Sequence, residues 1–245
     1  MRTAAIDAQE HYTLEHPARD ETKEEARELD KKTFQAWNGH GTLKVIENKV
    51  NGCQISFDTK VSRAKRAVMQ MLGIPEPIEL ERKYAVEVSA PVPETLADAG
   101  IRYTVVQITQ YYLHTDGVDE RRLRERIFRG KSAFYYAKKE ETGDPEKRIE
   151  REKIITADRF EELYAERNLE YSPISKRRIC FVYDGNYFKL DDFNGELAGY
   201  QLLEVEPLFA DDQVNFPSFI TVKQEVTDTP RYGRNSQLAR YGLPE

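Results

Sequence analysis

Residues 78–84 read Ile-Glu-Leu-Glu-Arg-Lys-Tyr, a stretch in which glutamate, glutamate and lysine recur at every second position. Successive side chains of a β-strand point to opposite faces, so Glu79, Glu81 and Lys83 would share one face. Three ionised groups on one face of a strand indicate that this face lies against water or against a charged ligand. One strand alone does not distinguish these two alternatives.

The same alternation of charges returns along the chain. Carboxylates dominate the first and last of these segments, whereas arginine and lysine dominate two of the three middle ones. A solvent-exposed face is the simpler interpretation of any single strand, but such a face would mix both signs within each strand. The segregation therefore favours strands that close around a ligand of both polarities. The later segments are Arg122/Arg124/Arg126, Arg148/Glu150/Glu152, Lys176/Arg178 and Glu204/Glu206.

Carboxylates and guanidinium groups in one cavity would suit a phosphate chain with bound metal ions. Mg²⁺ is usually held by a few carboxylates together with substrate phosphates. Phosphate oxygens are in turn bound by arginine forks and lysine ammonium groups. Placing both sets in one cavity neutralises charges that would otherwise each cost several kcal/mol to bury.

The extended segments predict one antiparallel sheet. Short turns such as Asp116-Gly117 and Asp184-Gly185 favour hairpins, and a helix capped by Thr156 is expected over 157–168. About eight such strands can close into a barrel that holds one small ligand. We therefore expect an α+β fold, a closed antiparallel β-barrel of about eight strands with flanking helices. The expected strands lie near 79–88, 102–113, 119–128, 132–140, 148–155, 174–183, 186–193 and 199–206.

The N-terminal part of the chain has a mainly helical pattern. Thr22 begins a capping-box sequence that opens one helix, and Ser56 can cap a second. A short buried strand is expected over 43–46. Pro75 and Pro77 make a stiff connector after the second helix. The predicted domains are residues 1–74 and residues 75–245.

The composition argues against several classes of protein. The chain has 245 residues and a net charge of −6, which argues against a nucleic-acid partner because phosphate backbones select basic faces. Hydrophobic residues make up 39%, enough for a core, and charged residues 33%, above the usual quarter. Cys53 and Cys180 have no metal-type spacing. No apolar run resembles a signal peptide or a membrane span, so we expect a cytoplasmic protein without a membrane partner.

Taken in order, the charged motifs resemble those of the CYTH superfamily, the triphosphate tunnel metalloenzymes. One Glu-x-Glu-x-Lys triplet is common in charged proteins, but a series of ordered matches over roughly 130 residues is specific. Ala137 and Lys189 depart from the family pattern, which affects the expected substrate rather than the fold. The matches after residues 78–84 are Gln110–Leu113, Arg122–Arg124, Lys139, Arg148–Glu152, Lys176–Arg178 and Leu203–Glu206.

The resemblance implies Mg²⁺- or Mn²⁺-dependent attack on a triphosphate, and it implies roles for individual residues. The implied metal ligands are Glu79, Glu81, Glu150, Asp191, Glu204 and Glu206. The implied phosphate-binding residues are Lys83, Arg122, Arg124, Arg126, Lys139, Arg148, Lys176 and Arg178. The implied catalytic residues are Lys83, Arg124, Lys139 and Glu152. Crowded carboxylates would repel one another without metal, so replacing Glu81 or Glu204 is expected to leave the melting temperature unchanged or higher.

Three functions are compatible with such a site. Hydrolysis of inorganic triphosphate or of an organic or nucleoside triphosphate is favoured, because no segment can be assigned to base recognition and hydrolysis is the less demanding chemistry. A class IV-type adenylate cyclase is the first alternative. A non-catalytic polyphosphate- or nucleotide-binding module is the second, although a pure binder has no need of so many metal-type glutamates. In each case the expected partner is a triphosphate-containing small molecule.

The flanks resemble proteins that fuse a P-loop kinase-like domain to a CYTH domain. The phosphate-cradling motif Gly-x-x-x-x-Gly-Lys-Ser/Thr does not occur in the chain. Residues 1–74 are therefore expected to be a helical remnant of such a domain, and to contribute little to triphosphate binding. The matching segments are Ala18–Thr22, Trp37–Asn48, Glu225–Thr227 and Asn235–Arg240.

Overall fold

Ten antiparallel strands form the main sheet in the part of the chain that the structure describes. The computed structural model describes residues 1–15, 20–40, 43–72, 78–115, 119–141, 147–207, 212–227 and 229–243. In spatial order the strands are β12 (Ile220–Glu225), β4 (Arg82–Val88), β11 (Gln201–Val205), β10 (Asn186–Phe193), β9 (Ile174–Tyr183), β5 (Tyr103–Tyr112), β6 (Glu120–Phe128), β7 (Lys131–Glu141), β8 (Lys147–Ile155) and β3 (Ile78–Leu80). A separate hairpin consists of β1 (Lys49–Val50) and β2 (Cys53–Gln54).

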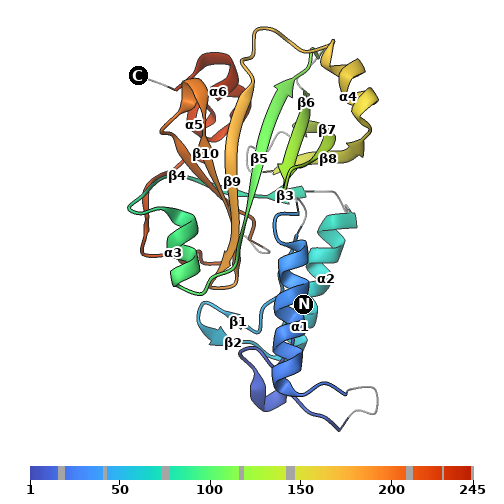
Figure 1. Cartoon of the computed structure of the whole chain (residues 1–245), viewed down its shortest axis with the longest axis vertical. Coiled ribbons are helices and arrows are strands. Elements are labelled where there is room, and N and C mark those ends of the chain that lie inside the picture. Colours follow the sequence, from blue (N-terminus) through green and yellow to red (C-terminus); the bar gives the residue numbers. More distant parts are fainter. Residues whose placement is uncertain are drawn as a thin grey trace.

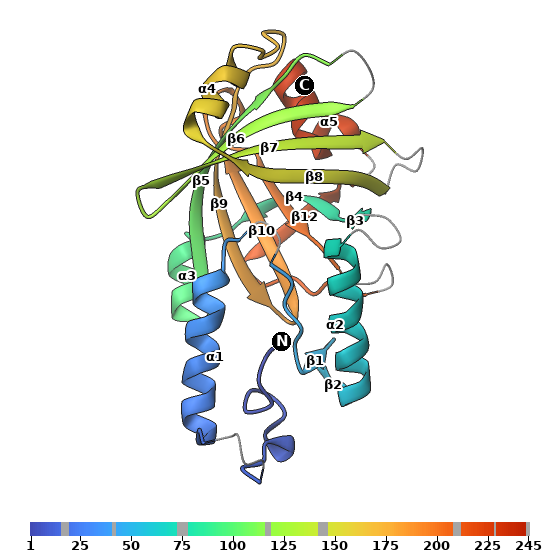
Figure 2. The same ribbon diagram turned by 90° about the vertical axis from the view of Figure 1, so that its right-hand side faces the viewer.

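Helices lie at both ends of this sheet. The long helices α1 (Lys23–Trp37) and α2 (Phe57–Leu72) occupy one end, together with the β1–β2 hairpin (Figure 1). The opposite end carries α4 (Ala157–Tyr164), α5 (Pro230–Gly233) and α6 (Asn235–Tyr241), as the perpendicular view in Figure 2 also shows. The remaining helix, α3 (Val92–Asp98), packs beside β5.

Helices α1, α2 and α4 begin where the sequence predicts caps. The Thr22 hydroxyl accepts a hydrogen bond from the Glu25 amide at 3.2 Å, and the Glu25 carboxylate accepts one from the Thr22 amide at 2.8 Å. This reciprocal pair is a capping box, which satisfies two amides that the first turn leaves free. Ser56 caps α2 and Thr156 caps α4 in the simpler one-bond form.

Two tight turns fix the register of neighbouring strands. Asp184 and Gly185 join β9 to β10 with φ values of 44° and 76°, and Arg129 and Gly130 join β6 to β7 with 50° and 73°. Two successive positive φ values are typical of the type I′ hairpin turn. The turn predicted at residues 184–185 is thereby confirmed, whereas the one predicted at 116–117 lies outside the described residues.

The predicted closed barrel is not a complete ring of hydrogen-bonded strands, because β12 and β3 form two edges. β3 and β4 are separated only by Glu81, which belongs to neither strand. Through them the extended stretch 78–88 pairs with β8 at its start and with β11 farther on. The chain itself thus links the two ends of the sheet, but the ladder does not close at Glu81.

Other differences from the predicted elements are local. The ten strands exceed the predicted number because 79–88 forms two strands and β12 was not predicted. Residues 43–46 form no strand; Ile46 instead packs against Ala67 of α2, and its carbonyl accepts a hydrogen bond from the Arg2 amide at 2.9 Å. The helix predicted over 157–168 ends at Tyr164.

The two faces of the sheet differ in chemistry. One face carries an apolar core in which alternate residues of four strands pack against Val92 and Leu96 of α3. The opposite face, here named the inner face, carries the residues whose parity matches that of Lys83, Arg178 and Glu204. The core residues of the strands are Tyr84, Val86, Ile179, Phe181, Phe188, Leu190, Leu203 and Val205.

Helix α6 covers one part of the inner face. Leu238 and Ala239 of α6 pack in one buried cluster with Tyr112, Ile174 and Leu202. Ile174 and Leu202 precede the charged residues Lys176 and Glu204 by two, and Tyr112 lies opposite Arg122, so all three share the inner face with the charged residues. In the described chain, no helix is long and apolar enough to cross a membrane.

Candidate functional site

Strand pairing brings most of the predicted site residues onto the inner face. Residues directly opposite each other in an antiparallel pair share a face, and Glu204 lies opposite both Lys83 and Lys189. Asp191 likewise lies opposite Arg178. The same registers continue through the pairs Arg178–Val106, Lys176–Ile108, Ile108–Arg126, Gln110–Arg124, Arg122–Ala137, Ala137–Glu152 and Lys139–Glu150.

For two of the predicted site residues, the structure describes the backbone but not the side chain. Glu79 of β3 pairs with Arg148 of β8, but the side chains of both lie outside the described part of the structure. Their predicted roles therefore stay predictions.

The charged side chains of the inner face are largely removed from solvent. Burying a single charge costs several kcal/mol unless a partner of opposite sign and further hydrogen bonds compensate it. The inner face meets this requirement through three groups of ion pairs, described below. The buried members, each at most 9% exposed, are Arg122, Arg126, Lys176, Arg178, Lys189, Asp191 and Glu204.

The first group is centred on Asp191, which is fully buried. Arg178 donates to both oxygens of Asp191 at 2.6 Å each, and Lys176 donates to Oδ2 at 2.5 Å. The second guanidinium nitrogen of Arg178 also reaches Glu204 at 2.5 Å. Asp191 thus fixes two cations at once, and both of its oxygens already accept hydrogen bonds from them.

The second group joins β6, β7 and β8. Arg122 donates to Glu150 at 2.5 Å, and Lys139 contacts the other oxygen of Glu150 at 2.6 Å. Arg124 donates to Glu152 at 2.7 Å. The two arginine pairs reach across β7 from β6 to β8, and Lys139 joins the neighbouring strands β7 and β8, so the pairs tie the three strands together on the inner face.

The third group lies around β4 and the end of β11. The Lys83 ammonium is 2.9 Å from Glu81 and 3.9 Å from Glu204, so two carboxylates approach one cation. Glu206 is held by the ammonium groups of both Lys189 and Lys44.

Burial and pairing shift the pKa values of these groups. Burial lowers the pKa of Lys176 to about 8, although Asp191 opposes the shift. Burial alone would raise the pKa of Glu206, but Lys189 and Lys44 outweigh it and hold the value at about 2. For Arg124, burial and the neighbouring Arg122 guanidinium lower the pKa. Lys176 and Arg124 are therefore only partly compensated, whereas the carboxylates beside Arg122 and Arg178 outweigh burial and raise the pKa values of these two guanidinium groups.

Three buried polar atoms of this region lack a partner within the described residues. They are Nε of Arg122, Nε of Arg124 and the side-chain oxygen of Gln110. Buried donors without acceptors are rare in folded proteins and call for a specific explanation. A bound anion would supply acceptors for the two guanidinium N–H groups.

The carboxylates provide a donor set of the kind that hard divalent cations prefer. Glu81 and Glu204 already approach one positive charge together, which fits a shared cation. Within the described residues, no three His, Cys, Asp or Glu side chains are close enough to form a complete metal site. Glu79, predicted as a ligand, has its side chain outside the described part of the structure.

Some residues of the inner face were not predicted as site residues. Lys189 has the same parity as Asp191, and this signal was available in the sequence. Glu120, whose carboxylate is 3.4 Å from Arg122, also has the parity of its strand. Cys180 faces inward and is buried, and burial raises the pKa of its thiol. Lys44 comes from outside the sheet, and no sequence pattern indicated it.

The N-terminal segment, expected to be a helical remnant that contributes little to triphosphate binding, contacts the inner face directly. The Gly39 amide donates to the Tyr187 hydroxyl at 3.1 Å, and the Arg126 guanidinium donates to the Gly39 carbonyl. Asn38 donates to the Cys180 carbonyl at 3.3 Å. Arg126, predicted to bind phosphate, is thus engaged by the backbone of this segment.

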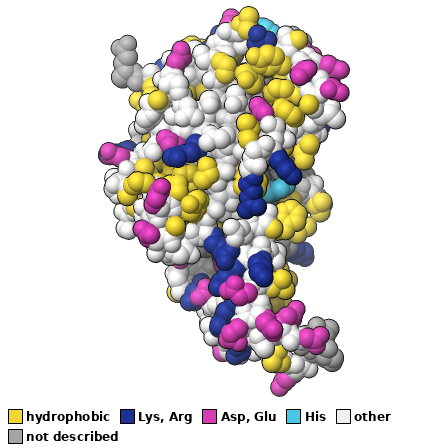
Figure 3. All heavy atoms as spheres, in the orientation of Figure 1, with side chains coloured by type: hydrophobic (Ala, Val, Ile, Leu, Met, Phe, Trp, Pro, Cys, Tyr) yellow, Lys and Arg dark blue, Asp and Glu magenta, His cyan; other side chains and the backbone are white. Residues whose placement is uncertain are grey.

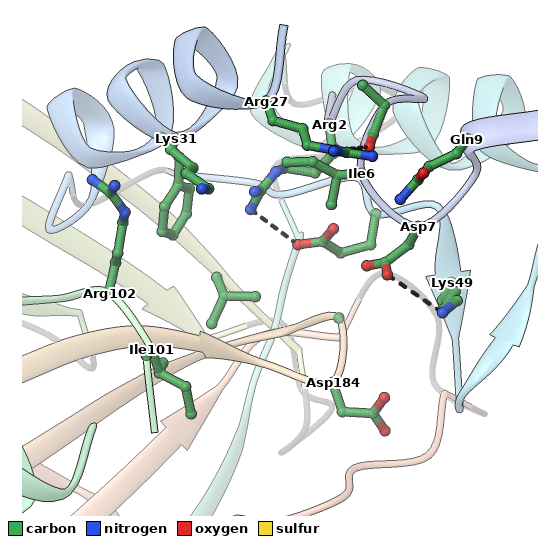
Figure 4. Close-up of a pocket in the computed structure, with 16 residues that line it drawn as sticks. Arg2, Ile6, Asp7, Gln9, Arg27, Lys31, Lys49, Ile101, Arg102 and Asp184 are labelled. Carbon is green, nitrogen blue, oxygen red and sulfur yellow. Dashed lines mark hydrogen bonds and ion pairs between the residues drawn. The ribbon is translucent and has the colours of Figure 1, made fainter. Parts of the chain in front are cut away.

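A separate pocket of about 540 Å³ lies between the N-terminal segment and the ends of β5 and β9. Arg27 and Lys31 of α1 and Arg102 point into it from one side (Figure 4). The space-filling view shows Lys and Arg side chains gathered at the level where the N-terminal helices meet the sheet (Figure 3). These three side chains have partners, Glu24 for Arg27, Glu28 for Lys31 and Gln35 for Arg102. Arg2 pairs with Glu47, and Lys49 pairs with Asp7. This pocket is distinct from the inner face.

No family model matches the chain, and no curated protein matches it. Several solved structures are similar. The inorganic triphosphatase NE1496 is 28% identical with a TM-score of 0.46, over 68% of this chain and 97% of that one. PH1819 from Pyrococcus horikoshii is 20% identical, with a TM-score of 0.41, over 55% and 80%. HpAC1 from Hippeastrum, a candidate adenylyl cyclase with a dominant triphosphatase activity, is 13% identical, with a TM-score of 0.38, over 52% and 80%.

Proposed function

We propose that this chain binds a triphosphate on the inner face and hydrolyses it with the help of Mg²⁺ or Mn²⁺. The observation that carries the proposal is the pair of buried N–H groups on Arg122 and Arg124 that lack acceptors among the described residues. They share the inner face with the buried cations Lys176 and Arg178. Donors arranged in this way suit an anion with several oxygens, and a phosphate chain is such an anion.

The cations of the inner face are proposed to bind the phosphate oxygens. Their carboxylate partners would orient them before the substrate arrives, so that little rearrangement is needed on binding. Asp191, predicted as a metal ligand, is better explained as a positioning residue, because Lys176 and Arg178 occupy both its oxygens. The proposed phosphate-binding residues are Lys83, Arg122, Arg124, Lys139, Lys176 and Arg178.

Mg²⁺ or Mn²⁺ would neutralise phosphate oxygens and make a bound water more acidic. Glu81 and Glu204 are the proposed ligands within the described side chains, since both already approach the Lys83 ammonium. Glu79, Glu150 and Glu206 complete the proposed set. Glu206 would first have to release one of its two lysines.

Glu152 is the proposed base. Its side chain is 18% exposed and accepts one hydrogen bond from Arg124, so an oxygen is left that a water could reach. Water attacks the terminal phosphorus, the bond to the bridging oxygen breaks, and the water proton passes to Glu152. The arginines and lysines stabilise charge that spreads over the phosphate oxygens in the transition state.

The proposal is tested first by phosphate release from inorganic triphosphate, ATP, GTP and thiamine triphosphate, with Mg²⁺ or Mn²⁺. Arg124→Ala should lower turnover by about 100-fold, because a preorganised cation contributes most in the transition state. Calorimetric affinity for inorganic triphosphate should fall less, by about tenfold.

Arg151→Ala is the matched control, because Arg151 lies on β8 but is exposed on the opposite face. It should leave both turnover and affinity unchanged. Tight binding by the wild type without release of phosphate, pyrophosphate or a cyclic nucleotide would contradict the proposed enzymatic activity. It would support a non-catalytic binding module instead. A cyclic nucleotide as the product from ATP would identify a cyclase instead.

A further inference from the structure

The turn after α1 lies between β6 and β10 and contacts both strands. Its centre is Gly39, whose carbonyl accepts from Arg126 of β6 and whose amide donates to Tyr187 of β10. β6 and β10 are separated by β9 and β5 in the sheet order. One residue of the N-terminal segment therefore bridges strands that are not neighbours, across the inner face.

The fit around Gly39 leaves no room for a side chain. Its φ is 90°, and an added Cβ would lie 2.8 Å from Cγ2 of Thr104, which belongs to the inner face of β5. The preceding residue, Asn38, is only 4% exposed. Only glycine allows the backbone to approach a strand this closely at a positive φ without strain.

Lys44 adds a charge from the same segment. Its ammonium pairs with Glu206 beside Lys189, so two lysines share one carboxylate at this end of the inner face. A cavity of about 20 Å³, roughly the space of one water, is lined by Lys44, Glu206 and Tyr187. Polar side chains thus line a cavity the size of one water at the point where the N-terminal segment meets the sheet.

Two charged side chains next to the N-terminal segment are less exposed than two carboxylates elsewhere on the inner face. The side chains of Glu120 and Glu152, on β6 and β8, are 23% and 18% exposed. Those of Lys189 and Glu206, next to Lys44, are 8% and 7% exposed. A ligand of the inner face would therefore enter near Glu120 and Glu152, and it would meet Gly39 and Lys44 at the far side.

We propose that Asn38, Gly39 and Lys44 form the end wall of the triphosphate site, so that the site accepts only a phosphate chain with a free end. The proposal rests on the proposed triphosphate binding. A terminal phosphoryl group carries about two negative charges near neutral pH, more than an internal one. Lys44 and Lys189, which share the single carboxylate of Glu206, match this terminal charge, and Lys44 is the specificity-determining residue.

The experiment compares calorimetric affinities of the full chain for two probes in the presence of Mg²⁺. Inorganic triphosphate has free ends, whereas a dinucleoside triphosphate carries a nucleoside on both ends. We expect inorganic triphosphate to bind and the dinucleoside triphosphate to bind at least about 100-fold more weakly, because the end wall excludes the second nucleoside.

Variants at position 44 separate the proposed contact from a structural role. Lys44→Ala should weaken inorganic triphosphate binding about tenfold, and Lys44→Arg, which keeps the charge, should restore most of it. Lys32→Ala removes an exposed lysine of α1 and should change nothing. Thermal unfolding of each variant shows whether the fold is retained.

Three results would each overturn the proposal of an end wall: equal binding of the two probes, no binding of inorganic triphosphate, or unchanged affinity of folded Lys44→Ala. Phosphate release is measured in parallel on the same samples. Binding with the expected preference but without turnover would contradict the proposed hydrolase and leave the end wall in place.

Discussion

At the scale of single residues, the inner face consists of charges held in pairs. Parity along the strands predicted that these residues share a face, because the side-chain period of a strand is two. Parity could not predict which charges pair. Glu204 was expected to suffer repulsion from other carboxylates, but it is held by Arg178 at 2.5 Å and approached by Lys83 at 3.9 Å.

This pairing reverses the expected effect of Glu204→Gln on stability. Glu204 is 4% exposed, and removing one partner of a buried ion pair leaves the other charge uncompensated, at a cost of about 3 kcal/mol. Glu81→Gln should cost less, about 1 kcal/mol, because Glu81 keeps 14% exposure and a single ion pair. Urea unfolding without metal measures both values. A Glu204→Gln variant as stable as the wild type would show that repulsion, not pairing, dominates.

Glu47 predicts a pH effect on stability outside the inner face. Burial raises the pKa of this carboxyl above 4.5, although Arg2 opposes the shift. Just above pH 4.5 the folded protein keeps a proton that the unfolded chain has lost. The free energy of unfolding should therefore fall as pH rises through this window, by at most about 1.4 kcal/mol per pH unit.

Glu47→Gln should remove that component of the pH dependence. Chemical unfolding between pH 4.5 and 7 is the measurement, with the wild type and Glu25→Gln as comparisons. Glu25 is fully exposed and its pKa is lowered by the Thr22 backbone, so its contribution has the opposite sign. Parallel wild-type and Glu47→Gln curves would contradict the assignment.

At the scale of elements, the strongest sequence signals produced the most accurate predictions. Alternating charges and hairpin turns located the strands from β4 to β11, and capping residues located α1, α2 and α4. The sequence did not predict elements in which the periodic pattern of side chains is short or interrupted. β12 contains a bulge between Val222 and Gln224 that interrupts its alternation, and α3 has only seven residues after a proline. Closure of the barrel depends on pairing at Glu81, which local sequence does not encode.

The packing of α5 against the segment after β12 allows a sharp test. Gly233 of α5 is buried, and a Cβ at this position would lie 2.1 Å from the Val226 carbonyl oxygen. Because the obstacle is backbone, Gly233→Ala should destabilise the protein by at least about 2 kcal/mol. Arg240→Ala on the exposed side of α6 is the control; it removes an exposed ion pair with Glu170 and should cost no more than about 1 kcal/mol. Thermal and urea unfolding compare them; equal stability of Gly233→Ala would mean that α5 is not packed as described.

At the scale of the whole molecule, the site combines two parts that the sequence separates. Strand parity predicted the inner-face residues of the sheet, since each strand repeats the same period. It could not predict that Gly39 and Lys44, from a segment treated as an appendage, would reach that face. Contacts of this kind depend on how elements that are distant in the sequence pack together, and no local pattern in residues 38–44 predicts them. The division into domains at residues 74–75 remains a prediction.

The central claim is that the inner face binds a triphosphate, and a crystal structure with inorganic triphosphate and Mg²⁺ tests it most directly. We predict phosphate oxygens within hydrogen-bond distance of Arg122 and Arg124, and accepting from the Nε atoms that lack partners among the described residues. The terminal phosphoryl group should lie beside Lys44. A triphosphate found instead in the pocket lined by Arg27, Lys31 and Arg102, with the inner-face ion pairs unchanged, would contradict the account.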